Sequence, residues 1–335
     1  MRSMLACLLF VSTPLLAQEV PSADSQIAAG PEVREMDAIV VTGVQPGPGM
    51  WKVSKGDHVL WIMGTLTPLP KGMTWLSRDV ESVLAQADEV IDPPGADFDA
   101  DVGMFRGMLM IPSLLKARKN PDGKTLSEIL PAPIYARWSS LKAKYLGRDA
   151  GIEKWRPVFA SQELYQAAIK KSGLTQSGVV SPVVERLAKA GKIKRTPALV
   201  KVTVENPKQA IKEFSASSLA DIDCFDKTLA RLESDLPLMT ARANAWSIGD
   251  IEALRGLPYE DQNRTCLNAF LQTGIAQKRG MDTLPQRVEA MWLAKAEAAL
   301  AANKVTFSTL PISTMLKPNG YLSKLAAKGY LIEEP

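Results

Sequence analysis

The first regular pattern along the chain is a pair of apolar runs separated by a short polar turn. The runs cover residues 50–53 and 59–63, with Lys55, Gly56 and Asp57 between them. Apolar runs that flank a glycine-containing turn are typical of a β-hairpin. Apolar positions at helical spacing then follow Ser77, which predicts a helix capped by that serine. We expect the run at 90–91 to be a short buried strand.

Between about residues 100 and 280 the apolar positions recur mainly at helical spacing. One β-branched stretch, residues 201–204, is predicted to be a strand. The predicted helices of this region are 134–146, 158–171, 183–190 and 207–214, followed by a long helical run around 224–245.

Strands return at the end of the sequence. A long helix begins near Pro285, where a proline is welcome because its missing N–H has no helical partner. A predicted strand at 305–307, a helix from Gly320 to Leu325 and a final strand at 329–332 follow. Strands at both ends with helices between them predict an α/β (α+β) fold. We expect a mixed central β-sheet from the N- and C-terminal strands, with a large, mainly helical insertion at about 100–280.

The first 17 residues have the order of a secretory signal peptide: Arg2, an apolar run at 4–16, and the small residue Ala17. That run is too short to span a bilayer, and we expect no later transmembrane segment. The polar residues 18–36 predict a flexible mature N-terminus, and a β-branched run at 37–42 predicts a strand. We therefore expect a periplasmic or secreted protein, cleaved near Ala17, with a single domain at 37–335.

Export determines how the cysteines are interpreted. Cys7 would leave with the signal peptide, so Cys224 and Cys266 would remain. Two thiols in an oxidising compartment favour a disulfide over a reactive thiol or a thiolate metal ligand. Closing a loop of about 40 residues would stabilise the fold by roughly 4 kcal/mol in the chain-entropy model.

Charge adds little to the choice of partner. The formal net charge is +4, and the basic residues are spread along the chain except for small clusters at 116–119 and 192–195. Such clusters are typical of a solvated helix face or loop, so we expect no nucleic-acid partner.

Candidate catalytic chemistry is limited by a single histidine, His58, at the shoulder of the predicted hairpin. One imidazole supports neither a catalytic triad in this turn context nor a metal site that needs two histidines. Four carboxylates lie close in sequence but do not match a Ca²⁺ loop, and a solvated acidic loop is favoured over an oxygen-ligand site; they are Asp92, Asp97, Asp99 and Asp101.

Several short motifs resemble, in order and spacing, the TraB/GumN family. They begin with Trp51-Lys52-Val53, the strand 60–65, and a helix ending at Ala87-Asp88 before strand 89–91. A Trp-x-x-Gly-Asp segment at 246–250 and a helix containing Arg287 continue the similarity, and Gly320-Tyr321-Leu322 and Gly329-Tyr330 complete it. The resemblance covers about residues 50–335 and is fairly specific.

The resemblance implies a metal-dependent peptidase-like site with two Gly-x-x-His motifs, a carboxylate and an arginine. Here the first motif is Gly64-Thr65-Leu66-Thr67 and the second is Pro311-Ile312-Ser313-Thr314, so threonine replaces both histidines. The carboxylate falls at Asp92, or one position later at Pro93, and the arginine is Arg287. Neutral hydroxyls are poor ligands for a transition metal, so we expect no metal and no cofactor. Arg287 would contact an anion or form a surface salt bridge.

Three functions remain open. The first is a pseudoenzyme that binds a peptide, a glycan or another envelope protein; a polysaccharide-related role is an analogy with the family name only. The second is a hydrolase with an altered site that uses Asp92, Thr67, Ser313 or Thr314. The third is a structural protein whose helical insertion is an interaction surface.

Overall fold

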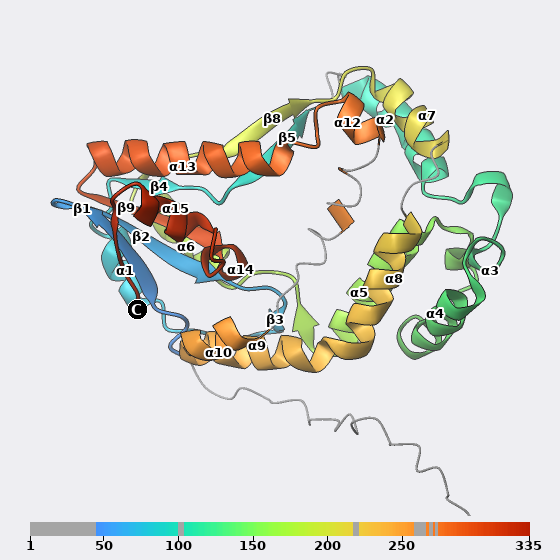
Figure 1. The fold of residues 1–335 in the computed structure, drawn as a ribbon, viewed down its shortest axis with the longest axis horizontal. Coiled ribbons are helices and arrows are strands. Elements are labelled where there is room, and N and C mark those ends of the chain that lie inside the picture. Colours follow the sequence, from blue (N-terminus) through green and yellow to red (C-terminus); the bar gives the residue numbers. More distant parts are fainter. Residues whose placement is uncertain (1–44, 100–103, 217–220, 258–265, 268–270, 272–273) are drawn as a thin grey trace, which may run out of the picture. The chain divides into compact units, whose positions relative to one another are not determined.

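The computed structural model describes residues 45–99, 104–216, 221–257, 266–267, 271 and 274–335 (Figure 1). The predicted signal peptide, the segment 18–36 and the predicted strand at 37–42 lie outside these residues, as does Asp101. Among the described residues, no helix is long and apolar enough to cross a membrane.

A six-stranded mixed sheet is built from five strands near the two ends of the sequence and one strand, β7, from its middle (Figure 1). In sheet order its strands are β10 (Leu331–Glu333), β1 (Met50–Lys55), β2 (His58–Thr65), β9 (Val305–Pro311), β4 (Glu89–Ile91) and β7 (Lys194–Thr196). β1 pairs antiparallel with β2 and β10, whereas β2, β9, β4 and β7 run parallel. The predicted α/β fold with a mixed central sheet and many helices is confirmed, but one strand of that sheet, β7, comes from within the predicted helical insertion.

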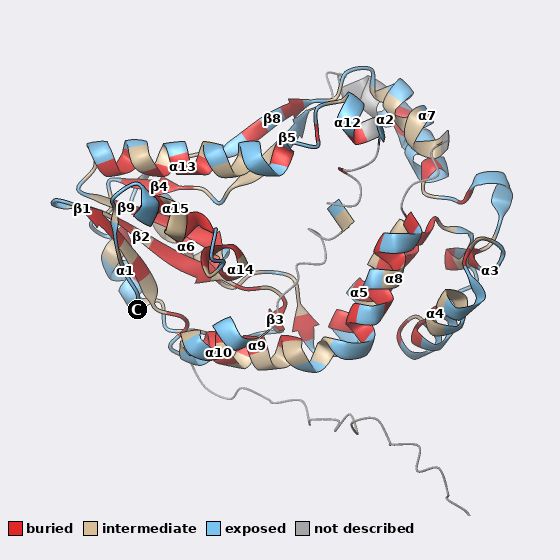
Figure 2. Cartoon of the chain, in the orientation of Figure 1, coloured by how far each residue is buried: buried red, intermediate tan, exposed pale blue. Residues whose placement is uncertain are grey.

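The central strand β9 explains why the sheet is well buried. Every residue from 306 to 310 is buried, as expected for a parallel strand covered on both faces. Helix α13 (Leu284–Ala302) contacts β2, β4 and β9, and its inward face is buried (Figure 2). On that face Trp292 is fully buried and packs edge-on against Tyr321 of α15 (Tyr321–Ala327), with ring centroids 5.1 Å apart.

A second apolar core lies in the helical insertion, around Trp138, Leu164 and Phe225. The helices that supply it are α3 (Leu126–Ile129), α4 (Ala132–Tyr145), α5 (Pro157–Lys171), α8 (Asp221–Ser234) and α9 (Leu236–Ile248). The predicted helical run around 224–245 is therefore two helices. Pro237, in the first turn of α9, lacks the N–H that would continue α8 through this point.

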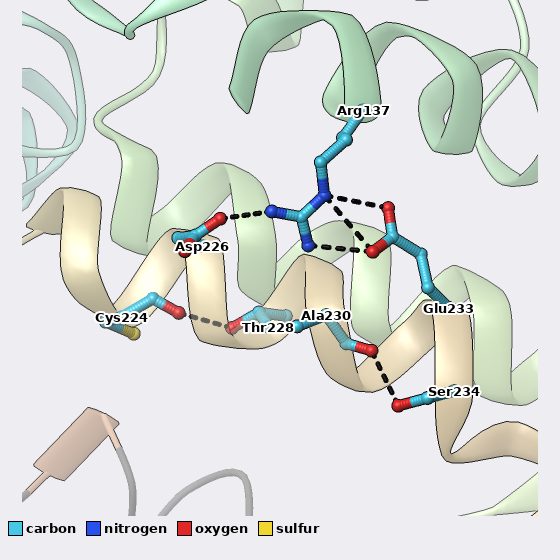
Figure 3. Close-up of polar contacts among 7 residues, drawn as sticks. All are labelled: Arg137, Cys224, Asp226, Thr228, Ala230, Glu233 and Ser234. Carbon is cyan, nitrogen blue, oxygen red and sulfur yellow. Dashed lines mark hydrogen bonds and ion pairs between the residues drawn. The ribbon is translucent and has the colours of Figure 1, made fainter. Parts of the chain in front are cut away.

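Polar contacts fasten α4 to α8 at the rim of this core (Figure 3). The Arg137 guanidinium donates to both carboxylate oxygens of Glu233, from Nε at 3.0 and 3.1 Å and from Nη2 at 2.7 Å. A further Arg137 nitrogen donates to the Asp226 carboxylate. Within α8, the Thr228 hydroxyl donates to the Cys224 carbonyl. This forked arrangement fixes the orientation of the two helices better than a single charge pair would.

The predicted disulfide between Cys224 and Cys266 is present. Cys224 is buried in α8, and the bond ties this helix to the described residues 266–267.

The prediction of an acidic loop at 92–101 was wrong in its secondary structure. Residues 95–99 form strand β5 (Gly95–Asp99), which pairs in parallel with β8 (Leu199–Thr203), the strand predicted at 201–204. Asp97 and Asp99 are exposed on β5, and Asp97 lies opposite Lys201. The opposite charge of its partner strand allows this acidic segment to be extended, a pairing that local sequence does not show.

Two other details differ from the sequence predictions. Lys194 and Arg195 are not on a helix or in a loop but form the edge strand β7, where exposed charges are typical. Ser77 does precede helix α1 (Arg78–Leu84), but its hydroxyl donates to the Glu81 carboxylate rather than capping a backbone N–H.

The remaining elements are short or peripheral to the sheet. They are β3 (Leu69–Pro70), β6 (Leu174–Thr175), α2 (Met104–Ala117), α6 (Val180–Ala190), α7 (Pro207–Ala216), α10 (Ile251–Gly256), α12 (Gly274–Lys278), α14 (Ile312–Met315) and the 3₁₀ turns Pro121–Gly123 and Gly151–Lys154.

Replacing both cysteines by serine (Cys224→Ser with Cys266→Ser) is expected to lower the free energy of unfolding by about 4 kcal/mol. Without the cross-link, the unfolded chain has a higher conformational entropy. Urea denaturation of the oxidised wild type, the reduced wild type and the variant measures this loss. The reduced wild type should match the variant. Two titratable thiols in the oxidised protein would contradict the assignment.

A buried ion pair joins Arg156 to Asp221, with Nε to Oδ2 at 2.9 Å. Removing one partner leaves the other charge buried alone, so Arg156→Met is expected to lower the free energy of unfolding by roughly 3–5 kcal/mol.

Burial raises the pKa of the Asp221 carboxyl, and Arg156 offsets this only in part. A raised folded-state pKa means that this carboxyl's contribution to stability is lost as pH rises through that pKa. Asp221→Asn should therefore remove this loss, measured by urea denaturation from acidic to neutral pH.

Candidate functional site

The two degenerate motifs leave the sheet side by side. β2 and β9 are parallel neighbours, with Gly64 opposite Leu310 and Thr65 opposite Pro311. Because both strands end at the same edge, Thr67 and Thr314 follow the same edge of the sheet. β4 is the parallel neighbour of β9 on the other side, and Asp92 comes directly after it. Three of the predicted site positions, Thr67, Asp92 and Thr314, therefore follow the ends of neighbouring parallel strands.

Gly64 permits a close approach at this exit. A Cβ at this position would lie 3.0 Å from the Ile312 side chain and 3.3 Å from Trp51. The Gly64 carbonyl accepts a hydrogen bond of 2.9 Å from the indole N–H of Trp246, which is fully buried on α9. Glycine thus lets Ile312 of α14 and Trp51 of β1 pack against the end of β2.

The Trp-x-x-Gly-Asp segment acts as a structural joint. After Trp246 bonds the strand exit, Gly249 ends α9 in a left-handed conformation (φ 74°), which glycine adopts without strain. Asp250 then caps α10 by accepting from the backbone N–H of Ala253 at 2.9 Å. Trp246, Gly249 and Asp250 of the motif thus each have a structural role.

Thr314 is held within its own turn. It is buried in α14, and its hydroxyl donates to the Pro311 carbonyl at 2.8 Å. Its own carbonyl lies against Gly320, where a Cβ would come within 2.1 Å of that oxygen. Thr67 is half-buried after β2 and precedes Pro68 in a cis peptide bond.

Asp92 and Arg287 lie in different surroundings. The Asp92 carboxylate accepts from Arg195 of β7, from Nε at 3.0 Å and from Nη2 at 2.5 Å. Arg287 is exposed in the first turns of α13. Its neighbours Leu284 and Val288 pack in a small apolar cluster with Val200 and Val202 of β8. The predicted anion contact of Arg287 stays a prediction, and among the described residues it forms no salt bridge.

A cavity of about 350 Å³ adjoins the two threonine positions. Leu66 and Ser313, the residues immediately before Thr67 and Thr314, both line it. The cavity is also lined by Arg242 of α9, by Leu254 and Arg255 of α10, by Leu257 directly after α10, and by residues 316–318. Neither Asp92 nor Arg287 is among the described residues that line it.

The sequence analysis missed the contribution of α10. Leu254, Arg255 and Leu257 line the cavity, and none of them was singled out. A signal was present, because Asp250 followed by apolar residues at 251 and 254 has the pattern of a capped helix.

These residues do not fit a transition metal. The Thr314 hydroxyl donates a hydrogen bond to the Pro311 carbonyl, and the Asp92 carboxylate forms an ion pair with Arg195. Across the part of the chain that the structure describes, no group of three His, Cys, Asp or Glu side chains could hold a metal ion. The donor set at the sheet edge is two hydroxyls and one paired carboxylate, which is poor for such an ion.

His58 has a structural role. Its Nδ1 donates to the Asn303 carbonyl at 2.6 Å, and its Nε2 lies 3.5 Å from the Asp57 carboxylate. Both contacts are at the amino end of β2, whereas the cavity adjoins its carboxyl end.

Comparison with known families gives a match over residues 49–334 to the TraB/PrgY/gumN family. The chain belongs to this family. Searches of curated proteins and of solved structures found no match. The family match spans the sheet and the helical insertion, so the strand exits at Gly64 and Pro311 both lie within it.

Trp246→Phe removes the hydrogen bond to Gly64 but keeps an aromatic side chain. We expect it to lower the free energy of unfolding by about 1–3 kcal/mol more than a matched control, because it leaves a buried carbonyl unpaired. The control is Trp292→Phe: Trp292 is equally buried, but its indole N–H has no partner among the described residues. Equal losses in urea denaturation would contradict a stabilising role for this bond.

Proposed function

We propose that this TraB/PrgY/gumN family member is an exported protein that binds a ligand at the sheet edge without metal-dependent peptidase activity. The observation that carries the proposal is the state of the two motif positions. Threonine stands at both, and the Thr314 hydroxyl is bonded within its own turn. The binding or accessory role would lie in the cell envelope.

The chemistry of the cavity favours a peptide as the ligand. Most of its wall is apolar, from leucines at 66, 254, 257 and 316 and from Ile312. Three cationic side chains, Arg242, Arg255 and Lys317, also line it, and Lys317 is exposed. Arg242 is paired with Asp235. Arg255 is already paired with Glu252 and Glu334. An apolar pocket beside an exposed ammonium group suits a peptide that has a large apolar side chain and a terminal carboxylate.

The alternative, a hydrolase with a non-histidine site, has less support. Ser313 lines the cavity and could in principle be a nucleophile. A serine needs a base within hydrogen-bond reach, and no carboxylate or imidazole occurs among the described lining residues. The nearest predicted carboxylate, Asp92, is held by Arg195.

Export is supported by two independent features. The first 17 residues have the signal-peptide pattern, and a disulfide joins Cys224 to Cys266. Structural disulfides persist in oxidising compartments, so the bond agrees with a periplasmic or secreted location.

The purified protein is expected to contain far less than one transition metal ion per chain and to hydrolyse no peptide with or without added Mn²⁺ or Zn²⁺.

An N-acetylated leucine tripeptide with a free carboxylate should bind at least tenfold more tightly than its amide. Lys317→Glu should remove this preference, because it reverses the charge at the cavity. Calorimetry measures binding, and elemental analysis measures metal.

The matched control is Lys71→Glu, the same change at an exposed lysine that does not line the cavity. It should bind the tripeptide like the wild type. Stoichiometric metal, or peptide turnover abolished by Thr67→Ala or Thr314→Ala, would refute the non-catalytic assignment. Binding of envelope glycan and not of peptide would refute the choice of ligand.

A further inference from the structure

A second and larger cavity, of about 770 Å³, lies in the helical insertion. Among the described residues, five lysines and a single carboxylate, that of Asp122, line it; the lysines are Lys116, Lys119, Lys154, Lys208 and Lys212. It shares no lining residue with the cavity at the sheet edge. All five lysines are exposed, and within the described residues none of them forms an ion pair.

Backbone pairing fixes two of these lysines. Lys119 forms an isolated antiparallel bridge with Trp155. The N–H of Asn120 donates to the Lys154 carbonyl at 2.9 Å, and the N–H of Arg156 donates to the Arg118 carbonyl at 2.9 Å. Lys119 and Lys154 are therefore held on adjacent strands of a short ladder.

Helices α2 and α7, which lie side by side, supply the other three (Figure 1). Lys208 and Lys212 are one turn apart on α7 and so lie on the same face, while Lys116 is in the last turn of α2. The end of α7 is held by Arg156, which donates to the Phe214 carbonyl at 2.6 Å and stacks on its ring at 4.5 Å. The buried Arg156–Asp221 pair thus positions a wall of this cavity.

Asn120 gives the cavity a second recognition element. This side chain is only 5 % exposed and lines the cavity. Its Nδ2 donates to the Lys124 carbonyl at 2.9 Å, but its Oδ1 accepts no hydrogen bond from the described residues. A buried carbonyl oxygen without a donor is unfavourable, and a ligand hydroxyl would satisfy it.

We infer that this cavity binds a small molecule with two or more anionic groups and at least one hydroxyl group, such as a sugar or polyol phosphate. Cations that line one concave surface add their fields and concentrate anions there. Five ammonium groups against one carboxylate leave a strong positive excess, and Asn120 selects for a hydroxyl beside the anions.

The test is calorimetric titration of the full exported protein with two bisphosphates. Fructose 1,6-bisphosphate has hydroxyls, and hexane-1,6-diol bisphosphate has the same charged groups without them. We expect both to bind, the sugar at least fivefold more tightly, with affinities that fall as salt is raised. The double variant Lys208→Gln with Lys212→Gln should weaken both at least tenfold.

The control is Lys189→Gln with Lys201→Gln, which removes two charges from exposed lysines outside the cavity. It should bind like the wild type, and circular dichroism should show both variants folded. No binding by the wild type at millimolar bisphosphate, or equal weakening in both double variants, would overturn the site. Equal affinity for the two probes would overturn the role of Asn120.

Discussion

The parallel pairing of β2 with β9 is the contact on which the rest of the fold depends. It joins the two ends of the sequence, since Val59 lies opposite Val305 and Thr65 opposite Pro311. Everything between these strands, including the whole helical insertion, is a loop that this pairing closes. The entropy cost of closing a loop grows only slowly with its length, so the large insertion is compatible with a stable sheet. β1 and β10 extend the sheet on one side, and β4 and β7 extend it on the other.

Polar contacts at the start of β9 join it to its two neighbours, β4 and β2. At its start, the Asp88 carboxylate accepts from the backbone N–H groups of Lys304 and Val305 at 3.0 and 3.1 Å. Asn303 donates to the buried Glu89 carboxylate at 2.7 Å. Burial alone would raise the pKa of Glu89, but hydrogen bonds from Thr196, Asn303 and Lys194 outweigh it and the pKa is lowered. The single histidine belongs to this cluster, which explains its presence far from the cavity.

Local sequence was sufficient where an element is defined by its own pattern. The hairpin at β1 and β2, the strands β4 and β8, and helices such as α5 and α13 follow from apolar spacing and turn residues. It was insufficient where a segment depends on a distant partner. β5 and β7 contain charged residues, and each forms a strand by pairing with a distant segment, β5 with β8 and β7 with β4. The pairing of β7 with β4 also brings Arg195 to Asp92. The lysine cavity was also beyond reach, because its cations come from three separate segments.

The residues that carry the family resemblance divide into two groups. Gly64 and Gly320 are required by close contacts, Asp88 caps the start of β9, and Trp246 fastens α9 to the end of β2. These roles stabilise the sheet and its exits whether or not a ligand is bound, so their presence supports the fold and gives no support for catalysis. Thr67 and Thr314 form the second group, because the sequence resemblance predicts that they replace two histidines. The contacts of the first group hold the strand ends in place, and the cavity lined by Leu66 and Ser313 lies beside the two threonines. The proposed binding role depends on this cavity and not on the two hydroxyls.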